Sequence, residues 1–130
     1  MTTTWKPENY NSVSVYIVAD HAQQVLDFLK KTFDATPLRR FAAPDGKIMH
    51  AEVRINDTVV MIAESGGAYP AFSVWLHVYV PDAHATYKKA LAAGGVSVQE
   101  PVHKPGDPDL RGGVKDPCGN TWWMSTQMAP

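Results

Sequence analysis

Val74-Trp-Leu-His-Val-Tyr-Val80 has the β-branched and aromatic composition of a strand, and Asp82, a good helix N-cap, follows it. The first part of the chain has the same arrangement, in which the run Val13-Ser-Val-Tyr-Ile-Val18 precedes Asp20. The two aspartates lie 62 positions apart, and this offset aligns the flanking apolar residues as well. The pattern therefore predicts an internal repeat.

Each copy of the repeat predicts the element order βαβββ. After Asp20, Val25, Leu26 and Leu29 lie on one face of a helix that closes near Thr36. The offset places Leu29 on Leu91, which predicts the second helix. The predicted later strands are residues 38–42, 47–55 and 58–63 in the first copy and 96–99, 112–115 and 121–126 in the second. Residues 101–108 are predicted to form a Pro-rich loop, and the copies cover about residues 10–66 and 72–128.

Two such units are too small to fold comfortably alone, because each buries only one face of its sheet. We expect them to pair within one domain, residues 1–130. The expected fold class is α+β, a curved mixed sheet with helices on its convex face and a concave cup. Alternate residues of several strands would line this cup, which is where we look for function.

Composition excludes several classes of function. The chain has 12 basic and 13 acidic residues and a net charge of -1, so it has no general field to attract nucleic acid or an anionic membrane. The single cysteine, Cys118, cannot form an internal disulfide, which fits a reducing compartment. No apolar run approaches the roughly 18 residues of a membrane span. We expect a cytoplasmic protein.

The duplicated pattern, with Gly46-Lys-Ile-Met-His-Ala-Glu-Val-Arg-Ile-Asn-Asp57 in one copy and Asp116-Pro-Cys-Gly-Asn-Thr-Trp-Trp123 in the other, resembles a known superfamily. This is the vicinal oxygen chelate superfamily of glyoxalases, bleomycin-resistance proteins and dihydroxybiphenyl dioxygenases, and the chain looks most like its PhnB-like branch. The resemblance covers nearly all of residues 10–128. Because this fold hosts several chemistries, the resemblance alone does not define the activity.

For catalysis, the resemblance implies a divalent metal held by four His or Glu side chains, which acts as a Lewis acid on the substrate. The corresponding positions in this sequence are Val13, Met61, Trp75 and Trp123. None of them carries an oxygen, imidazole or thiolate donor. We therefore expect neither the metal nor another cofactor.

Strand alternation supplies the other candidates for the cup. It places Trp75, His77 and Tyr79 on one face, and His50 and Glu52 on one face of another strand. Glu52 either orients His50 or acts as a general base, or it pairs with Arg54 or Lys115 at a wet edge. If Arg111 reaches the cup mouth, it can clamp a carboxylate or phosphate. The predicted ligand-binding residues are His50, Glu52, Met61, Trp75, His77, Tyr79, Arg111 and Trp123.

An apolar floor with a few polar side chains is typical of a small-molecule pocket, and flat aromatic ligands suit it. We therefore expect a metal-free binding protein, acting as a homodimer, that sequesters a drug or toxin. The alternative is a glyoxalase-type lyase, isomerase or dioxygenase that uses a displaced metal or acid-base chemistry at His50, Glu52 and His77. A third reading is a dimeric scaffold that binds no ligand.

Overall fold

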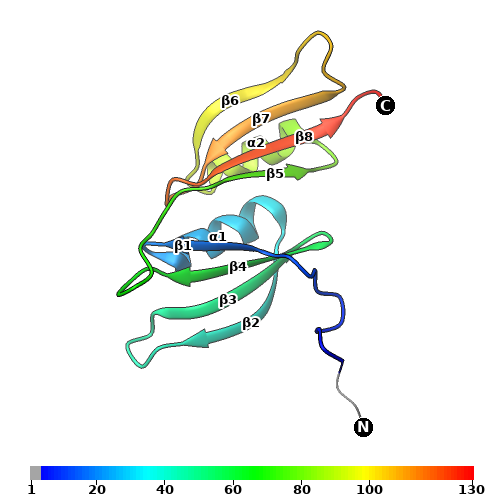
Figure 1. Cartoon of the computed structure of the whole chain (residues 1–130). Coiled ribbons are helices and arrows are strands. Elements are labelled where there is room, and N and C mark those ends of the chain that lie inside the picture. The colour runs from blue at the N-terminus through cyan, green and yellow to red at the C-terminus, as the bar shows by residue number, and fades with distance from the viewer. Residues whose placement is uncertain (1–3) are drawn as a thin grey trace.

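The computed structural model describes residues 4–130 and contains two βαβββ units in succession (Figure 1). The first unit consists of β1 (Val15–Ala19), α1 (Ala22–Phe33), β2 (Thr36–Ala42), β3 (Ile48–Ile55) and β4 (Thr58–Glu64). The second consists of β5 (Trp75–Tyr79), α2 (Ala83–Ala92), β6 (Val96–His103), β7 (Asp109–Lys115) and β8 (Thr121–Gln127). The predicted α+β class and the predicted repeat are confirmed.

The strands form two four-stranded sheets rather than one continuous sheet. Their strand orders are β1-β4-β3-β2 and β5-β8-β7-β6. In each sheet the first strand is parallel to the last strand of its unit, and the other pairs are antiparallel. Within residues 4–130 no strand of one sheet pairs with a strand of the other. Residues of β1 and β5, among them Val15 and Leu76, line a common cavity of about 310 Å³.

One hydrophobic core joins the two units. The ring centroids of Phe33 on α1 and Trp122 on β8 lie 5.4 Å apart, and Trp122 is 1% exposed. Buried residues of both units, among them Ile17, Leu29 and Met124, belong to the same cluster. Burial of large apolar side chains is the main favourable term in folding, so each unit depends on the other for its stability.

The repeat is offset by 61 residues over most of its length, not by the predicted 62. Tyr16 pairs with Met61 in the first sheet and His77 pairs with Trp123 in the second. Met61 and Trp123 are 62 positions apart, but Tyr16 and His77 are 61 apart. The turn between β7 and β8 is one residue longer than the turn between β3 and β4, and it shifts the offset.

This shift corrects two of the predicted equivalences. The counterpart of Trp75 is Ser14, whereas Val13 precedes β1 and is highly exposed. On the helices, Ala22, Val25 and Leu29 are buried at the places of Ala83, Thr86 and Ala90. Leu91, which was predicted to be the counterpart of Leu29, is 38% exposed.

The two helices begin differently. Asp82 is the N-cap of α2, as predicted, and its carboxylate accepts a hydrogen bond from the backbone N–H of Ala85 at 3.1 Å. The prediction of Asp20 as the N-cap of α1 is wrong, because His21 occupies that place in a left-handed conformation. The Glu64 carboxylate instead accepts from the backbone N–H groups of His21 and Ala22. Two of the free N–H groups of the helix terminus are thereby satisfied. Among residues 4–130, no helix is long and apolar enough to span a membrane.

Several predicted boundaries differ from the structure. β6 continues to His103, so the Pro-rich loop begins later than residue 101. Pro101 is accommodated because β6 is an edge strand, where a missing N–H donor costs little. β7 begins at Asp109 rather than at residue 112.

The Asp-Pro-x-Gly-Asn turn before β8 has a structural role. The buried Asp116 carboxylate accepts hydrogen bonds from the backbone N–H groups of Cys118 and Asn120 and from the indole N–H of Trp122. The thiol of Cys118 points to the first unit, where it donates to the carbonyl oxygen of Asp20 at 2.8 Å. This turn therefore fixes β8 and also contacts the other half of the molecule.

Candidate ligand-binding site

Six of the eight predicted site residues line two separate cavities. Trp75, His77, Arg111 and Trp123 line a cavity of about 440 Å³ in the second unit, which we call the second cavity. Its remaining lining residues are Gln99, Val102, Lys104 and Asp107. Glu52 and Met61 line another cavity of about 420 Å³ in the first unit, the first cavity. His50 belongs with Glu52, and Tyr79 lies beside His77 on β5.

Two tryptophans dominate the second cavity. The rings of Trp75 on β5 and Trp123 on β8 are arranged edge to face, with their centroids 5.4 Å apart. Trp75 is 77% exposed, so its ring is available to a ligand. Gly113 on β7 makes room for Trp123, because a Cβ at that position would lie 2.7 Å from the indole ring. The Trp123 ring can therefore occupy this position only because residue 113 has no side chain.

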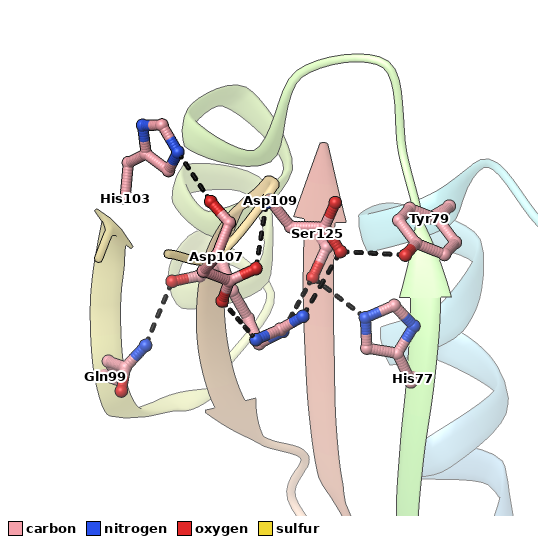
Figure 2. Close-up of polar contacts among 8 residues, drawn as sticks. His77, Tyr79, Gln99, His103, Asp107, Asp109 and Ser125 are labelled. Atoms are coloured by element: carbon pink, nitrogen blue, oxygen red, sulfur yellow. Dashed lines mark hydrogen bonds and ion pairs between the residues drawn. The ribbon is translucent and has the colours of Figure 1, made fainter. Parts of the chain in front are cut away.

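Figure 2 shows Asp107, Asp109 and Ser125, which are the hydrogen-bond partners of Arg111. Arg111 lines this cavity on its polar side. Its Nη1 donates to Asp107 at 2.8 Å, its Nη2 to Asp109 at 3.2 Å and its Nε to Ser125 at 3.0 Å. Two carboxylates and a hydroxyl thus hold the guanidinium from within the chain. A ligand carboxylate would share this guanidinium with the protein's own aspartates, so the bidentate clamp stays a prediction.

The other side chains around Arg111, Tyr79 and His77, are uncharged. The Tyr79 hydroxyl donates to Asp109 at 2.8 Å, and this hydrogen bond, with some burial, raises the pKa of the phenol. His77 Nε2 lies 2.8 Å from the Ser125 hydroxyl. Burial, followed by the charge of Arg111, lowers the pKa of His77, so its ring is neutral at physiological pH.

The first cavity is built around a buried carboxylate. Glu52 is 3% exposed, and it accepts hydrogen bonds from the Tyr10 hydroxyl at 2.5 Å and from His50 Nε2 at 2.8 Å. Tyr16 Oη lies 3.0 Å from the other imidazole nitrogen of His50. Burial raises the pKa of Glu52, but the hydrogen bonds from Tyr10 and His50 outweigh it, and the pKa is lowered overall. Of the two predicted roles, orientation of His50 matches this geometry, whereas Arg54 does not pair with Glu52.

The segment before β1 covers this carboxylate. The ring of Tyr10 lies between two guanidinium groups, 5.4 Å from Arg39 and 5.9 Å from Arg54. Arg54 also donates to the carbonyl oxygen of Asn9 at 2.6 Å, and the side chain of Asn11 accepts from the backbone N–H of Val59. Residues 9–11 are therefore fixed to the first sheet and form a wall of the first cavity.

Sequence reasoning missed several residues of these sites. Ser125 and Asp107 bind Arg111, and Tyr10 binds Glu52, but none of them was predicted to be a site residue. Ser125 lies two residues after Trp123 on the same strand face, so alternation along β8 contained a signal for it. Nothing in the local sequence places Tyr10, because its contact with β3 spans more than 40 residues.

The side chains at the positions implied for the superfamily's metal do not fit a divalent ion. Ser14, the corrected counterpart of Val13, offers only a hydroxyl, and Met61, Trp75 and Trp123 offer a thioether and two indoles. His50, Glu52 and His77, the proposed displaced site, are divided between the two units. Among residues 4–130, no group of three or more His, Cys, Asp or Glu side chains is placed to hold a metal.

Comparison with known proteins defines the class. The model of the Glyoxalase/Bleomycin resistance protein/Dioxygenase superfamily matches residues 11–124. The chain belongs to this superfamily. An uncharacterized protein of Mycobacterium bovis is 34% identical, and the match covers 85% of this chain and 80% of that protein.

Solved structures share the fold at lower identity. TioX from Micromonospora sp. ML1 is 22% identical with a TM-score of 0.72, and the match covers 89% of this chain and 99% of TioX. TnmS3, an antibiotic-binding protein from Streptomyces sp. CB03234, is 17% identical with a TM-score of 0.67. That match covers 90% of this chain and 97% of TnmS3. At these identities the similarity concerns the fold.

Proposed function

We propose that this protein is a metal-free binding protein of the superfamily that takes up a small planar aromatic molecule in the second cavity. The observation that carries the proposal is the Trp75–Trp123 pair, which stands at two of the positions implied for metal ligands. Sequestration of a drug or toxin is the role that we assign to it. The description of TnmS3 as an antibiotic-binding protein supports this assignment.

The dimensions of the second cavity support a ligand of this class. Its volume of about 440 Å³ lies within the range of small-molecule sites, roughly 300–1,000 Å³. A ring stacked on an indole gains about 0.5–1.5 kcal/mol beyond the burial of its area. Gln99 and Val102 on β6 form the opposite wall, so a flat molecule would fit between β6 and the tryptophans.

We also propose that the protein acts as a homodimer in the cytoplasm and belongs to the PhnB-like branch. The support for a dimer is the open sheet face, on which Trp75 and Tyr79 are 77% and 62% exposed. Large aromatic residues on an open face favour association, and two-fold pairs are the commonest soluble oligomers. Sedimentation equilibrium tests this part, and a monomer at micromolar concentration would contradict it.

Fluorescence titration tests the binding function. A panel of planar antibiotics is added to the protein while the tryptophan emission is recorded, and we expect saturable quenching at micromolar ligand. Trp75→Leu should weaken binding at least about tenfold. Because Trp75 is 77% exposed, this substitution should leave the protein folded. Trp5→Phe is the matched control, since Trp5 is exposed and lies outside the second cavity. If no compound of the panel gives saturable quenching, the proposal is rejected.

The alternative is acid-base catalysis at the first cavity, and it rests on the His50–Glu52 hydrogen bond. Both oxygens of Glu52 already accept hydrogen bonds from the protein, which favours a structural role for this pair. Turnover of a glyoxalase-type substrate that His50→Ala abolishes, while Trp75→Leu leaves it intact, would support the alternative.

A further inference from the structure

In the second cavity, two carboxylates surround the single guanidinium of Arg111. Asp107 and Asp109 both bind Arg111, so two carboxylates share one guanidinium. We call these three residues the acidic clamp. Tyr79 and His77, which contact it or lie beside it, are uncharged at neutral pH. The acidic clamp therefore has a net charge of about -1.

Asp107 presents this excess charge to the cavity. Asp109 is almost fully buried beneath Tyr79 and Arg111, whereas the side chain of Asp107 is 24% exposed and lines the cavity. The backbone N–H of Asp109 donates to Asp107 at 2.9 Å and fixes the carboxylate. This hydrogen bond and the charge of Arg111 lower the pKa of Asp107, which keeps it ionised.

Lys104 is the other charged residue that lines the cavity. It lies in the exposed turn between β6 and β7, outside the acidic clamp, and its charge is screened by solvent. No hydrogen bond or ion pair within residues 4–130 holds the Lys104 ammonium, whereas two hydrogen bonds fix the Asp107 carboxylate in the cavity. A ligand therefore meets the Asp107 charge in a constant position. The indole faces act in the same direction, because an aromatic face attracts a cation.

We infer that the second cavity selects planar molecules that carry a protonated basic nitrogen, with the nitrogen at Asp107 and the ring against Trp75. This inference rests on the proposed function and specifies its ligand class. A planar carboxylate is disfavoured, because it would compete with Asp107 and Asp109 for the guanidinium of Arg111. Neutral planar molecules bind through the rings alone.

Three probes with one ring system test the inference. They are 2-naphthylmethylammonium, 2-naphthylmethanol and 2-naphthoate, titrated separately against the full chain at pH 7 by calorimetry. We expect the ammonium compound to bind about tenfold more tightly than the alcohol, and the carboxylate to bind most weakly. Raising the salt concentration should weaken only the ammonium compound markedly.

Two variants locate the effect. Asp107→Asn keeps an oxygen for the backbone hydrogen bond but removes the charge, and it should abolish the tenfold advantage of the ammonium compound. Asp45→Asn is the matched control, since Asp45 is exposed and lies outside the second cavity, and it should leave that advantage intact. If Asp107→Asn fails to fold, the salt dependence of the unaltered protein decides the question.

The outcomes separate this inference from the proposed function. Saturable binding in which the ammonium compound has no advantage over the alcohol or the carboxylate overturns the inference and leaves the binding function standing. Absence of saturable binding for all three probes and for the antibiotic panel overturns both. An ammonium preference that persists without weakening in Asp107→Asn overturns the assignment to Asp107.

Discussion

The two halves of this protein carry the same strands and helices, but their concave faces have different centres. In the first half, Glu52 stands on β3 opposite Met61, and Tyr10 covers it. At the equivalent place of the second half, Gly113 stands on β7 opposite Trp123. The missing side chain at Gly113 lets the indole lie flat against β7. Two exchanges, Glu52 for Gly113 and Met61 for Trp123, thus separate a covered polar centre from an open aromatic floor.

The polar residues next to these positions differ as well. His50 in the first half corresponds to Arg111 in the second, and each contacts a carboxylate from its own half. In the first half, Tyr10 from the segment before β1 and His50 both donate to Glu52, so the buried carboxylate is paired within the protein. The second half leaves Trp75 exposed, and we assign ligand binding to it for this reason. A duplicated fold can therefore divide its two sites between stability and binding.

The largest effect is expected from Trp122, which joins the halves. Trp122→Ala should lower the free energy of unfolding by about 3–5 kcal/mol, because the side chain is fully buried against Phe33 of the other unit. Both halves should still unfold in one transition. Denaturation followed by circular dichroism and by tryptophan fluorescence measures this. Two separate transitions in the unaltered protein would show that the halves are independent.

Gly113→Ala should convert the second half partly towards the first. The added Cβ lies 2.7 Å from the ring of Trp123, so the indole must move, at a cost of about 1–3 kcal/mol in stability. Binding to the second cavity should weaken as the floor is displaced. Lys115→Ala, an exposed change on the same strand, is the control and should alter stability by less than about 0.5 kcal/mol. Unchanged binding in Gly113→Ala would show that the indole position is not needed.

Tyr10→Phe tests the covering of the first half. It removes the hydroxyl that donates to Glu52 while it keeps the ring between Arg39 and Arg54, and stability should fall by about 1.5 kcal/mol. Ligand binding to the second cavity should not change. Tyr69→Phe is the control, since Tyr69 is exposed. Thermal unfolding and calorimetric titration of both variants provide the comparison.

The smallest expected effect is a difference in pH dependence. The pKa of His77 is lower in the folded protein than in the unfolded chain. On acidification the unfolded chain therefore binds a proton near pH 6.5, whereas the folded protein binds it only at a lower pH. Stability from the second half is therefore complete above pH 6.5 and falls as the pH drops below it. The lowered pKa of Glu52 acts in the same direction in a more acidic range, since its stabilisation is present above about pH 4.5 and is lost as the pH falls through the lower folded value.

These two pH windows separate the halves. His77→Asn should flatten the pH dependence of stability just below pH 6.5 and leave the acid limb unchanged. Glu52→Gln should change the acid limb alone. Urea denaturation at several pH values between about 7.5 and 2.5 measures both. A His77→Asn profile identical to that of the unaltered protein would contradict the assignment.

The sequence predicted the architecture because strand composition and helical periodicity are local signals. The faces of β3 and β5 were also predicted correctly, since alternation fixes which residues share a side. The register of the repeat was wrong by one residue over β1 and α1, because a one-residue insertion in the turn before β8 has no compositional signature. Alignment of Asp20 with Asp82, whose true counterpart is His21, gave the wrong partner for Trp75.

The polar contacts of the site were less accessible from sequence. Arg111 was identified, but its pairing with Asp107 and Asp109 depends on how the β6–β7 hairpin folds back. Tyr10 lies in a segment without regular structure, and only tertiary contacts bring it to Glu52. Separation of the candidates into two cavities follows from the division of the strands into two sheets. Local patterns contain no information about that division.

The hydrogen bond from Cys118 to Asp20 makes this thiol a natural probe of whether the two units are in contact. Cys118 is the one cysteine of the chain, and burial followed by nearby carboxylates raises the pKa of its thiol to about 11. Alkylating reagents attack the thiolate, so modification at pH 8 should be slow while the halves are in contact. The rate of that modification would then measure how often the joint between the repeats comes apart, without any engineered label.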